Sequence, residues 1–301
     1  MDKIKKIMGF IMIILASILY GTLPLGISFG HNIGLVTEQI VIYRFIFSLP
    51  CIIIAVIILN KGKLNYKAGV KLMIVGGLGY GLTAMLLSKA YAILGTAPAT
   101  IIHFSYPAVI MSLEFLFLQK KISKGEIGAL FMVILALLLL LEYPIKLDGY
   151  GLICAVVSAF TYAGYIFFLS IQSKIKSVNP IERTFWILIG GTIFFVFRYG
   201  FINPEYFFIS SNQIVLLIAT AVFQTLLPVL FLILGLKYIR ASVAGIIGAL
   251  EPFTALLIGA IYFEESLIGK RGISAIFILL SVIWIGIVNL KEEKNACINK
   301  Q

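Results

Sequence analysis

Long apolar runs separated by short polar joints follow one another along the whole chain. A helix needs about 20 apolar residues to cross the hydrocarbon core of a bilayer, and runs of this kind occur ten times. They cover residues 7–29, 35–59, 69–93, 97–118, 125–141, 149–170, 183–201, 212–236, 242–263 and 269–290. The pattern predicts an all-α integral membrane protein with ten transmembrane helices.

One segment is present in two copies. The sequence GTAPATIIHFSYPAVIMSLEFLFLQKKIS surrounds Pro107, and RASVAGIIGALEPFTALLIGAIYFEESLI surrounds Pro252, 145 residues further on. The offset predicts two five-helix repeats, residues 1–145 and 146–292, followed by a short cytoplasmic tail, 293–301. Because five is odd, the second repeat enters the membrane from the opposite side, so the repeats are expected to be inverted. Paired interrupted helices of this kind indicate a transport site.

Composition agrees with a membrane protein. Hydrophobic residues make up 61% and charged residues 12% of the chain, and the mean hydropathy is +1.07. A soluble core of 301 residues could not bury this much apolar surface. Cys51, Cys154 and Cys297 stand alone, so their spacing predicts neither disulfides nor a metal site. The first apolar run is too long for a signal peptide and is expected to remain as an uncleaved first helix.

Topology explains the net charge of +11. With a cytoplasmic N-terminus, one side of the membrane holds 18 Lys and Arg residues. The other side holds four, Lys146, Arg198, Lys270 and Arg271. Since cytoplasmic loops carry an excess of Lys and Arg, this distribution predicts a multi-pass protein of the cytoplasmic membrane with both termini in the cytoplasm. It also excludes a nucleic-acid partner, because topology alone accounts for the basic residues.

Three motifs together resemble a known family. They are YRF in the second predicted helix, the small-residue segment ASVAGIIGALEP at the start of the ninth, and FEE at its end. With ten helices in two repeats, they are similar to the EamA branch of the drug/metabolite transporter superfamily over nearly the whole chain. Residues 118–121, LQKK, depart from the pattern, because such repeats usually place an acidic residue there. The resemblance implies transport of a small organic metabolite, by export more often than by uptake.

A few ionisable side chains lie inside the predicted spans. Each costs about 2.5–3.5 kcal/mol on insertion scales and is therefore a functional candidate. The set is Glu38, Arg44, Lys89, His103, Glu114 and Glu251. His103 and Glu114 are 11 residues apart, about three turns, and are expected on one face of a continuous helix. His103 is the preferred substrate or proton contact, since imidazole titrates near neutral pH.

Structural roles compete with these assignments. Lys89 lies near a helix end and can extend its ammonium to the surface, and Glu38 fits a solvated helix start better than a site. Arg44 keeps its charge and needs a partner, so it can equally tie helices together. The resemblance implies that the Glu251–Pro252 pair is common in the family, which fits architecture as well as transport. His103 can be a satisfied interior histidine.

Four prolines interrupt apolar runs and are expected to act as kinks or hinges: Pro24, Pro107, Pro228 and Pro252. A proline lacks an N–H and so frees the carbonyl four residues earlier. Here the freed carbonyls belong to Tyr20, His103, Gln224 and Gly248. In lipid a freed carbonyl must find a donor, so the kinks are expected to face one cavity. Tyrosines within the spans are expected to line it: Tyr20, Tyr106, Tyr162 and Tyr165.

These observations favour a transporter that moves a small organic metabolite, an amino acid or an amphiphilic compound, by alternating access, as an exporter. The predicted substrate or proton pathway holds His103, Glu251, Glu114, Arg44, Lys89, Tyr106, Gln224, Tyr20 and Tyr165. The expected partners are the substrate, the lipid bilayer and, where transport is coupled, protons. An uptake permease or facilitator remains open, as does a sensor or assembly subunit. The chain has no HExxH or P-loop motif, so we expect neither an enzyme nor a nucleotide-driven pump, and no cofactor or metal.

Overall fold

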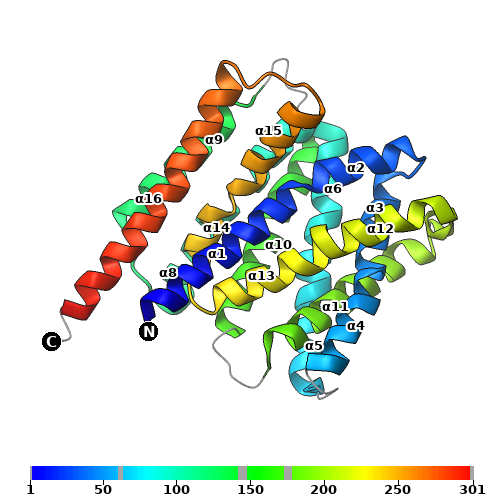
Figure 1. The fold of residues 1–301 in the computed structure, drawn as a ribbon, viewed down its shortest axis with the longest axis horizontal. Helices are drawn as coiled ribbons and strands as arrows, with labels where there is room; N and C mark the ends of the chain where they lie inside the picture. Colours follow the sequence, from blue (N-terminus) through cyan, green and yellow to red (C-terminus); the bar gives the residue numbers. More distant parts are fainter. Residues whose placement is uncertain (1, 60–63, 142–147, 173–177, 299–301) are drawn as a thin grey trace.

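The computed structural model describes residues 2–59, 64–141, 148–172 and 178–298, and every regular element within these ranges is helical (Figure 1). Nine helical segments of the described chain are long and apolar enough to cross a membrane. They are Ile4–Asn32, Thr37–Leu59, Tyr66–Leu94, Thr96–Leu118, Gly149–Ile171, Pro180–Gly200, Ser211–Leu236, Ala241–Tyr262 and Lys270–Asn289. The prediction of an all-helical fold with membrane-length apolar helices is confirmed.

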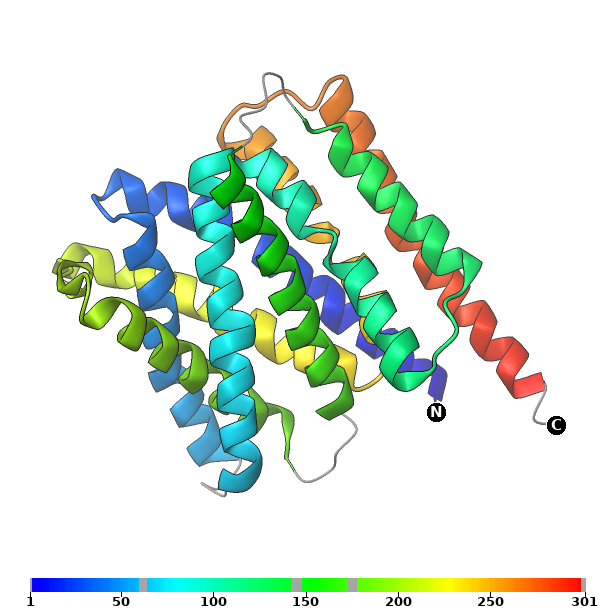
Figure 2. The same ribbon diagram turned by 180° about the vertical axis from the view of Figure 1, so that it is seen from behind.

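The fifth apolar run forms a shorter helix. α9 covers Lys124–Leu138, 15 residues, or about 22 Å, against about 30 Å for a bilayer core. Beyond it, the Leu140 and Leu141 N–H groups donate to carbonyls three residues back, which tightens the chain. α9 packs along α16 (Lys270–Ile298), and Figure 2 shows the two side by side at one edge of the bundle. A tenth crossing therefore remains a prediction.

Helical order is broken next to the four prolines. α1 (Asp2–Gly21) gives way to α2 (Leu23–Asn32) just before Pro24. Pro107 follows the break between α7 (Thr96–His103) and α8 (Tyr106–Leu118), and Pro252 follows the break between α14 (Ala241–Ile247) and α15 (Leu250–Tyr262). Before Pro228 a π-helical turn, Val222–Leu226, joins α12 (Ile214–Ala221) to α13 (Leu227–Leu236). A second π-helical turn, Val75–Gly81, joins α5 (Tyr66–Ile74) to α6 (Leu82–Leu94).

One of these breaks overturns a prediction. His103 is the last residue of α7, and Glu114 lies on α8. Phe104 and Ser105 separate the two helices, so the 3.6-residue period does not carry across. The prediction that His103 and Glu114 share one face of a continuous helix is wrong.

Side chains of other helices bind backbone carbonyls at two of the breaks, and one of these carbonyls has lost its helical donor. Between α14 and α15 the Ala249 N–H donates to a carbonyl three residues back. This leaves the Gly245 carbonyl without its helical donor, and the Tyr106 hydroxyl donates to it at 3.1 Å. At the break after α1, Gln224 Nε2 donates at 2.9 Å to the Thr22 carbonyl, which also accepts the Leu25 and Gly26 N–H groups. Because lipid supplies no donors, these contacts attach two of the interrupted helices to a partner.

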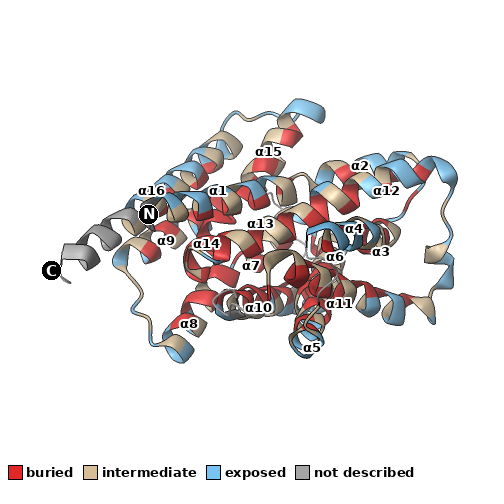
Figure 3. Ribbon diagram, turned by 60° about the horizontal axis from the view of Figure 1, so that its bottom comes forward, coloured by how far each residue is buried: buried red, intermediate tan, exposed pale blue. Residues whose placement is uncertain are grey.

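The helices pack with a repeating set of neighbours. α1 packs on α13 and α15, whereas α10 (Gly149–Gln172) packs on α6 and α8. α3 (Thr37–Ile46) packs on α12, and α11 (Pro180–Gly200) packs on α4 (Ser48–Leu59) and on the turn Val75–Gly81. All seven residues of α14 are buried, and buried positions gather on the faces that the helices turn toward one another (Figure 3). Both termini lie at the same end of the bundle (Figure 1).

Glycines allow α11 to approach the turn Val75–Gly81 closely. A Cβ at Gly76 would collide with the Ile187 carbonyl, and a Cβ at Gly190 would collide with the Met73 carbonyl. The two glycines thus serve one crossing from opposite sides. Small residues at helix crossings in membranes act in this way, because they let backbones meet.

We expect Gly190→Ala to destabilise the bundle, because the new methyl group meets a backbone carbonyl that cannot rotate away. The cost should be about 1–3 kcal/mol, as for other overpacked sites, and should appear as a lower melting temperature in detergent. Gly164→Ala is the matched control, since a Cβ at Gly164 has no neighbour within 4 Å. Equal melting temperatures for the two variants would contradict the tight crossing.

Candidate functional site

Buried oxygen atoms without hydrogen-bond partners lie in the central parts of four spans. They are the hydroxyls of Tyr20, Tyr80, Tyr165 and Thr225 and the amide oxygen of Gln224. None of these atoms has a partner of full hydrogen-bond geometry among the described residues, although the Tyr80 hydroxyl lies close enough to interact with those of Tyr20 and Thr225. A buried polar atom left unsatisfied costs about 1–3 kcal/mol, so each one calls for water or a ligand to bind it. We call these five residues the central polar cluster.

Irregular helix geometry supplies most of this cluster. Tyr80 belongs to the turn Val75–Gly81, and Gln224 and Thr225 belong to the turn Val222–Leu226. A π-helical turn inserts one extra residue into a helix, which rotates the following side chains and is frequent at functional sites. The remaining members, Tyr20 and Tyr165, come from α1 and α10. The cluster therefore joins four helices that are far apart in the sequence.

Aromatic rings continue from the central polar cluster toward α7. Successive ring centroids are 4.8 to 6.3 Å apart, within the range of favourable aromatic pairs. The order of the rings is Tyr20, Tyr80, Tyr165, Tyr162, Tyr106 and His103. This row brings together the tyrosines that the sequence indicated and adds Tyr80, which sequence reasoning missed.

His103 ends the row and is 4% exposed. Its Nδ1 lies 2.9 Å from Ser158 Oγ, and that hydroxyl donates its one proton to the Ala155 carbonyl at 2.6 Å. Ser158 must then accept from His103, so Nδ1 carries the hydrogen. In the neutral ring this leaves Nε2 as an acceptor on the side away from Ser158.

Glu251 is a half-buried carboxylate near the middle of its span. It forms no hydrogen bond or ion pair within the described residues, yet it interacts electrostatically with four buried or half-buried tyrosines. These are Tyr80, Tyr91, Tyr106 and Tyr162. The carboxyl group is thus within electrostatic range of the tyrosine row.

Arg44 is 4% exposed, and its Nε has no hydrogen-bond partner in the described part of the chain. The guanidinium carbon lies 5.5 Å from the centroid of the Phe45 ring, and the group interacts electrostatically with the Tyr80 hydroxyl. Arg44 and Glu251, of opposite charge, therefore both act on Tyr80. Neither is neutralised by an ion pair with a described residue.

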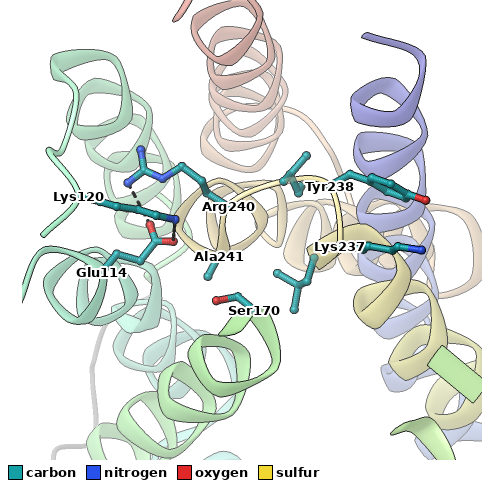
Figure 4. Close-up of a pocket in the computed structure, with 9 residues that line it drawn as sticks. Glu114, Lys120, Ser170, Lys237, Tyr238, Arg240 and Ala241 are labelled. Carbon is teal, nitrogen blue, oxygen red and sulfur yellow. Dashed lines mark hydrogen bonds and ion pairs between the residues drawn. The ribbon is translucent and has the colours of Figure 1, made fainter. Parts of the chain in front are cut away.

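Glu114 belongs to a different group of charges at the end of α8 (Figure 4). Its two carboxylate oxygens lie 3.3 Å from Lys120 Nζ and 3.0 Å from Arg240 Nη2. Arg240 also pairs with Glu126 at 3.1 Å, and the Ser242 hydroxyl donates to Glu126 at 2.9 Å. We call these residues, Glu114, Lys120, Glu126, Arg240 and Ser242, the end cluster. A pocket of about 140 Å³ lies beside it and is lined in part by Ser170 and Lys237.

Glu126 is 1% exposed and was missed as a site residue. A local signal was available, because Ser123 and Glu126 have the spacing of a capping box. The Glu126 N–H donates to Ser123 Oγ at 3.2 Å, and the Ser123 N–H donates to Glu126 Oε2 at 2.9 Å. Such a box explains the start of α9 but leaves one carboxylate oxygen free to bind Arg240.

Two other ionisable candidates lie outside both groups. Lys89 Nζ donates to the Tyr150 hydroxyl at 3.4 Å and lies 6.0 Å from that ring, near the end of its span. Glu38 lies in the first turn of α3, where a carboxylate is favoured by the helix dipole. The structure therefore leaves Lys89 and Glu114 apart from the other candidates. The candidates that it brings toward one region are His103, Tyr106, Tyr165, Tyr20, Gln224, Arg44 and Glu251.

Comparison with known proteins identifies the family. The sequence model of the EamA-like transporter family matches residues 7–142 and 149–287, which is most of the chain. The chain belongs to the EamA-like transporter family. This family is a branch of the drug/metabolite transporter superfamily, as the sequence motifs indicated.

Relatives of this EamA-like protein are distant. Protein PecM of Dickeya dadantii (strain 3937) is 21% identical over 226 residues, which are 74% of this chain and 76% of that protein. An uncharacterized transporter of Archaeoglobus fulgidus is 26% identical over 190 residues, 62% of this chain and 66% of that protein. A solved structure described as "Crystal structure of protein" has a TM-score of 0.78 and 13% identity, over 97% of this chain and 99% of that one. At this identity the solved structure shows a shared fold alone.

Family membership makes the chain a multi-pass membrane transporter, since EamA-like proteins are transporters and not enzymes. Residues 26–30 read GISFG and match the GxSxG spacing of hydrolases. They lie inside α2, whereas the catalytic serine of that motif requires a sharp turn between a strand and a helix.

We expect Arg240→Gln to destabilise this EamA-like protein strongly. The change leaves two buried carboxylates, Glu114 and Glu126, without their shared cation, and breaking a buried pair costs about 3–5 kcal/mol. The measurement is the melting temperature in detergent. Arg271→Gln is the matched control, because it breaks the exposed pair of Arg271 with Glu265, 33% and 46% exposed, and should cost about 1 kcal/mol or less. Equal losses would contradict a structural role for the end cluster.

Proposed function

We propose that this protein exports a small organic metabolite, an amino acid or an amphiphilic compound, across the cytoplasmic membrane by alternating access. The observation that carries the proposal is the central polar cluster. In a purely structural bundle, burying these oxygens without partners would cost free energy of folding with no compensating contact. A transporter, in contrast, needs polar groups that can bind a substrate in the middle of the membrane. Tyrosine and histidine rings beside them suit the carbon skeleton of an organic solute.

The proposed architecture is ten transmembrane helices in two inverted repeats, residues 1–145 and 146–292. The family match in two consecutive segments, 7–142 and 149–287, supports it. Packing supports it as well: the neighbours of α1 are α13 and α15, and those of α10 are α6 and α8. In the proposed repeats α1 is equivalent to α10, α6 to α13 and α8 to α15. Exchanging the repeats therefore converts one set of neighbours into the other. The two π-helical turns occupy equivalent places in the proposed repeats, and so do the helices broken before Pro107 and Pro252.

The proposed orientation places both termini in the cytoplasm. Its support is the 18 to 4 division of Lys and Arg between the two sides. Lys120, Lys237 and Arg240 then lie at the cytoplasmic end. The end cluster, also at that end, would close it by joining α8, α9 and the start of α14, and this role fits Glu114 better than proton transfer, because Glu114 has two cationic partners.

Alternating access would be a rocking of the two repeats about the central polar cluster, with the breaks before Pro24, Pro107 and Pro252 and the turn before Pro228 as hinges. Opening toward the cytoplasm would then require Arg240 to leave Glu114 or Glu126. If transport is coupled to protons, Glu251 and His103 are the proposed carriers, because both lie beside the tyrosine row. Without coupling, the same movement gives a facilitator.

Reconstitution tests the proposed function. Purified protein in liposomes should move at least one labelled amino acid or amphiphilic metabolite faster than empty liposomes do, and an imposed pH gradient should reveal whether protons are coupled. Selective proteolysis of the joints exposed on the outer face reports the orientation of the protein in the liposomes. With the orientation known, the direction of movement separates export from uptake. Absence of movement for the whole panel, in both directions and with or without a gradient, would contradict the proposal.

A threonine substitution separates a transport role from a structural one. We expect Thr225→Val to leave the melting temperature unchanged or raise it, because valine removes a buried hydroxyl that has no partner of full hydrogen-bond geometry. Burying such a hydroxyl costs about 1–3 kcal/mol. Transport should fall by about tenfold if that hydroxyl binds substrate, the loss of about one hydrogen bond.

Thr220→Val provides the control on the same span. The Thr220 hydroxyl is buried but already donates to the Leu217 carbonyl at 2.9 Å, so transport should stay the same. A lower melting temperature for Thr225→Val, with transport intact, would instead assign Thr225 to the packing of the bundle.

A further inference from the structure

The chain leaves α8 and α15, which are equivalent in the proposed repeats, by the same backbone turn. Gln119 and Glu264 both adopt a left-handed conformation, with φ of 51° and 56°. In each exit the N–H of the next residue donates to a carbonyl six residues back, at 3.2 Å after α8 and at 3.1 Å after α15. This is the hydrogen bond of a Schellman turn, so the two exits share one geometry.

Side chains at the two exits carry opposite charges. The first exit reads LQKK, residues 118–121, and the second reads FEES, residues 263–266. Because the backbone turn is shared, it does not itself select these charges. Lys120 has a structural use, since it pairs with Glu114 at 3.3 Å. Lys121 is exposed and forms no ion pair with a described residue, so packing of the bundle does not explain this cation.

Lys121 lines a surface cavity of about 360 Å³ together with Phe115 and Ile122. Phe115 is 56% exposed, and Ile122 is half-buried. No described acidic residue lines the cavity. The positive-inside rule accounts for a lysine in this joint, but it does not account for the place of that lysine beside an aromatic and an aliphatic side chain.

The Lys121 cavity lies where a bilayer passes from acyl chains to headgroups. Phe115 lies inside the apolar span Thr96–Leu118, and Lys121 lies three residues beyond its end. A tryptophan marks the same level, because Trp284 of α16 is 50% exposed and donates its indole N–H to the Gly125 carbonyl of α9 at 3.2 Å. Exposed tryptophans gather at the membrane–water interface. The cation is therefore at headgroup level, and the apolar lining extends toward the acyl chains.

A phospholipid with net negative charge matches both parts of this lining. Its acyl chain fits the apolar side chains, and its phosphate fits the lysine ammonium, a cation that basic segments near the membrane offer to anionic lipids. Exposed charges around the cavity favour the same sign: Lys121 and Lys124 are exposed, whereas the acid of this joint, Glu126, is 1% exposed and paired with Arg240. A zwitterionic headgroup brings its own ammonium group, which opposes this attraction.

We propose that the Lys121 cavity binds an anionic phospholipid of the cytoplasmic leaflet, with the phosphate on Lys121 and an acyl chain on Phe115 and Ile122. The choice of leaflet rests on the orientation proposed above, whereas the binding itself depends on no transport activity. The site adjoins the end cluster, because Phe115 and Lys121 directly follow Glu114 and Lys120 in the sequence.

Lipid binding to the purified protein tests the inference. Native mass spectrometry measures the affinity of the wild-type protein in detergent for phosphatidylglycerol and for phosphatidylethanolamine with the same acyl chains. Phosphatidylglycerol should bind about fivefold more tightly, the contribution of one lysine beside an anionic lipid. Soluble glycerol phosphate, which has the phosphate without the acyl chains, should not bind at the same concentrations.

Lys121→Gln should abolish the preference for phosphatidylglycerol and leave phosphatidylethanolamine binding unchanged, whereas Lys121→Arg keeps the charge and should keep the preference. Lys124→Gln is the matched control, because it removes an exposed lysine of the same joint that does not line the cavity. This control should bind both lipids as the wild type does.

Phe115→Ala should weaken both lipids by the same factor, since its ring faces the acyl chain that the two lipids share. Leu116→Ala is the matched control on the same helix. Leu116 is 67% exposed but does not line the cavity, so both lipids should bind this variant normally.

Three results would overturn the inference. The first is equal affinity of the wild type for the two lipids. The second is an equal loss of preference in Lys121→Gln and Lys124→Gln, which would assign both lysines to topology. The third is binding of glycerol phosphate as tight as that of phosphatidylglycerol, which would make the ligand a soluble anion. None of these results concerns transport, so the proposed function would stand; conversely, liposomes that move no solute would leave the lipid site intact.

Discussion

A backbone carbonyl that loses its helical donor inside lipid must find another donor, and this constraint organises the bundle. Where α14 ends, the Gly245 carbonyl is bound by the Tyr106 hydroxyl of α8. Where α1 ends, the Thr22 carbonyl keeps backbone donors, the Leu25 and Gly26 N–H groups, and is bound in addition by Gln224 of the turn Val222–Leu226. Two of the interrupted helices are thus held to a partner by a polar side chain from another span. The same interruptions turn tyrosine, glutamine and threonine side chains toward the centre, so structural repair and the candidate site have one cause.

Charged residues divide into two populations with different physical status. The end cluster pairs every carboxylate with a cation and uses the Ser123 capping box to hold Glu126, which compensates for burying these groups. Near the middle, Arg44 and Glu251 are not compensated in this way. A protein selected for stability alone would pair or replace them, since a well-packed apolar substitution is often as stable. Their presence is the clearest departure of this bundle from a purely structural design.

Sequence patterns predicted the helices better than the contacts between them. Spans were readable because twenty consecutive apolar residues have few other uses. Breaks near Pro24, Pro107 and Pro252 were readable because proline removes a helical hydrogen bond. The shortness of α9 was not, since Leu140 and Leu141 are as apolar as the helix before them and leave it through tighter turns. Tyr80 and Thr225 were passed over because a single hydroxyl in an apolar run has no periodic signature.

By itself the sequence determined the solvent, the family and the approximate limits of the helices, because these depend on local composition, on motifs and on the length needed to cross a bilayer. Tertiary structure decided which polar residues meet. It separated Glu114 from His103 by breaking the helix between them. It gave Glu114 two cationic partners, Lys120 and Arg240, and it left Arg44 and Glu251 without an ion-pair partner among the described residues. Whether a charge is paired depends on which helices pack together, and side chains 126 residues apart in sequence, such as Glu114 and Arg240, meet only in the folded bundle.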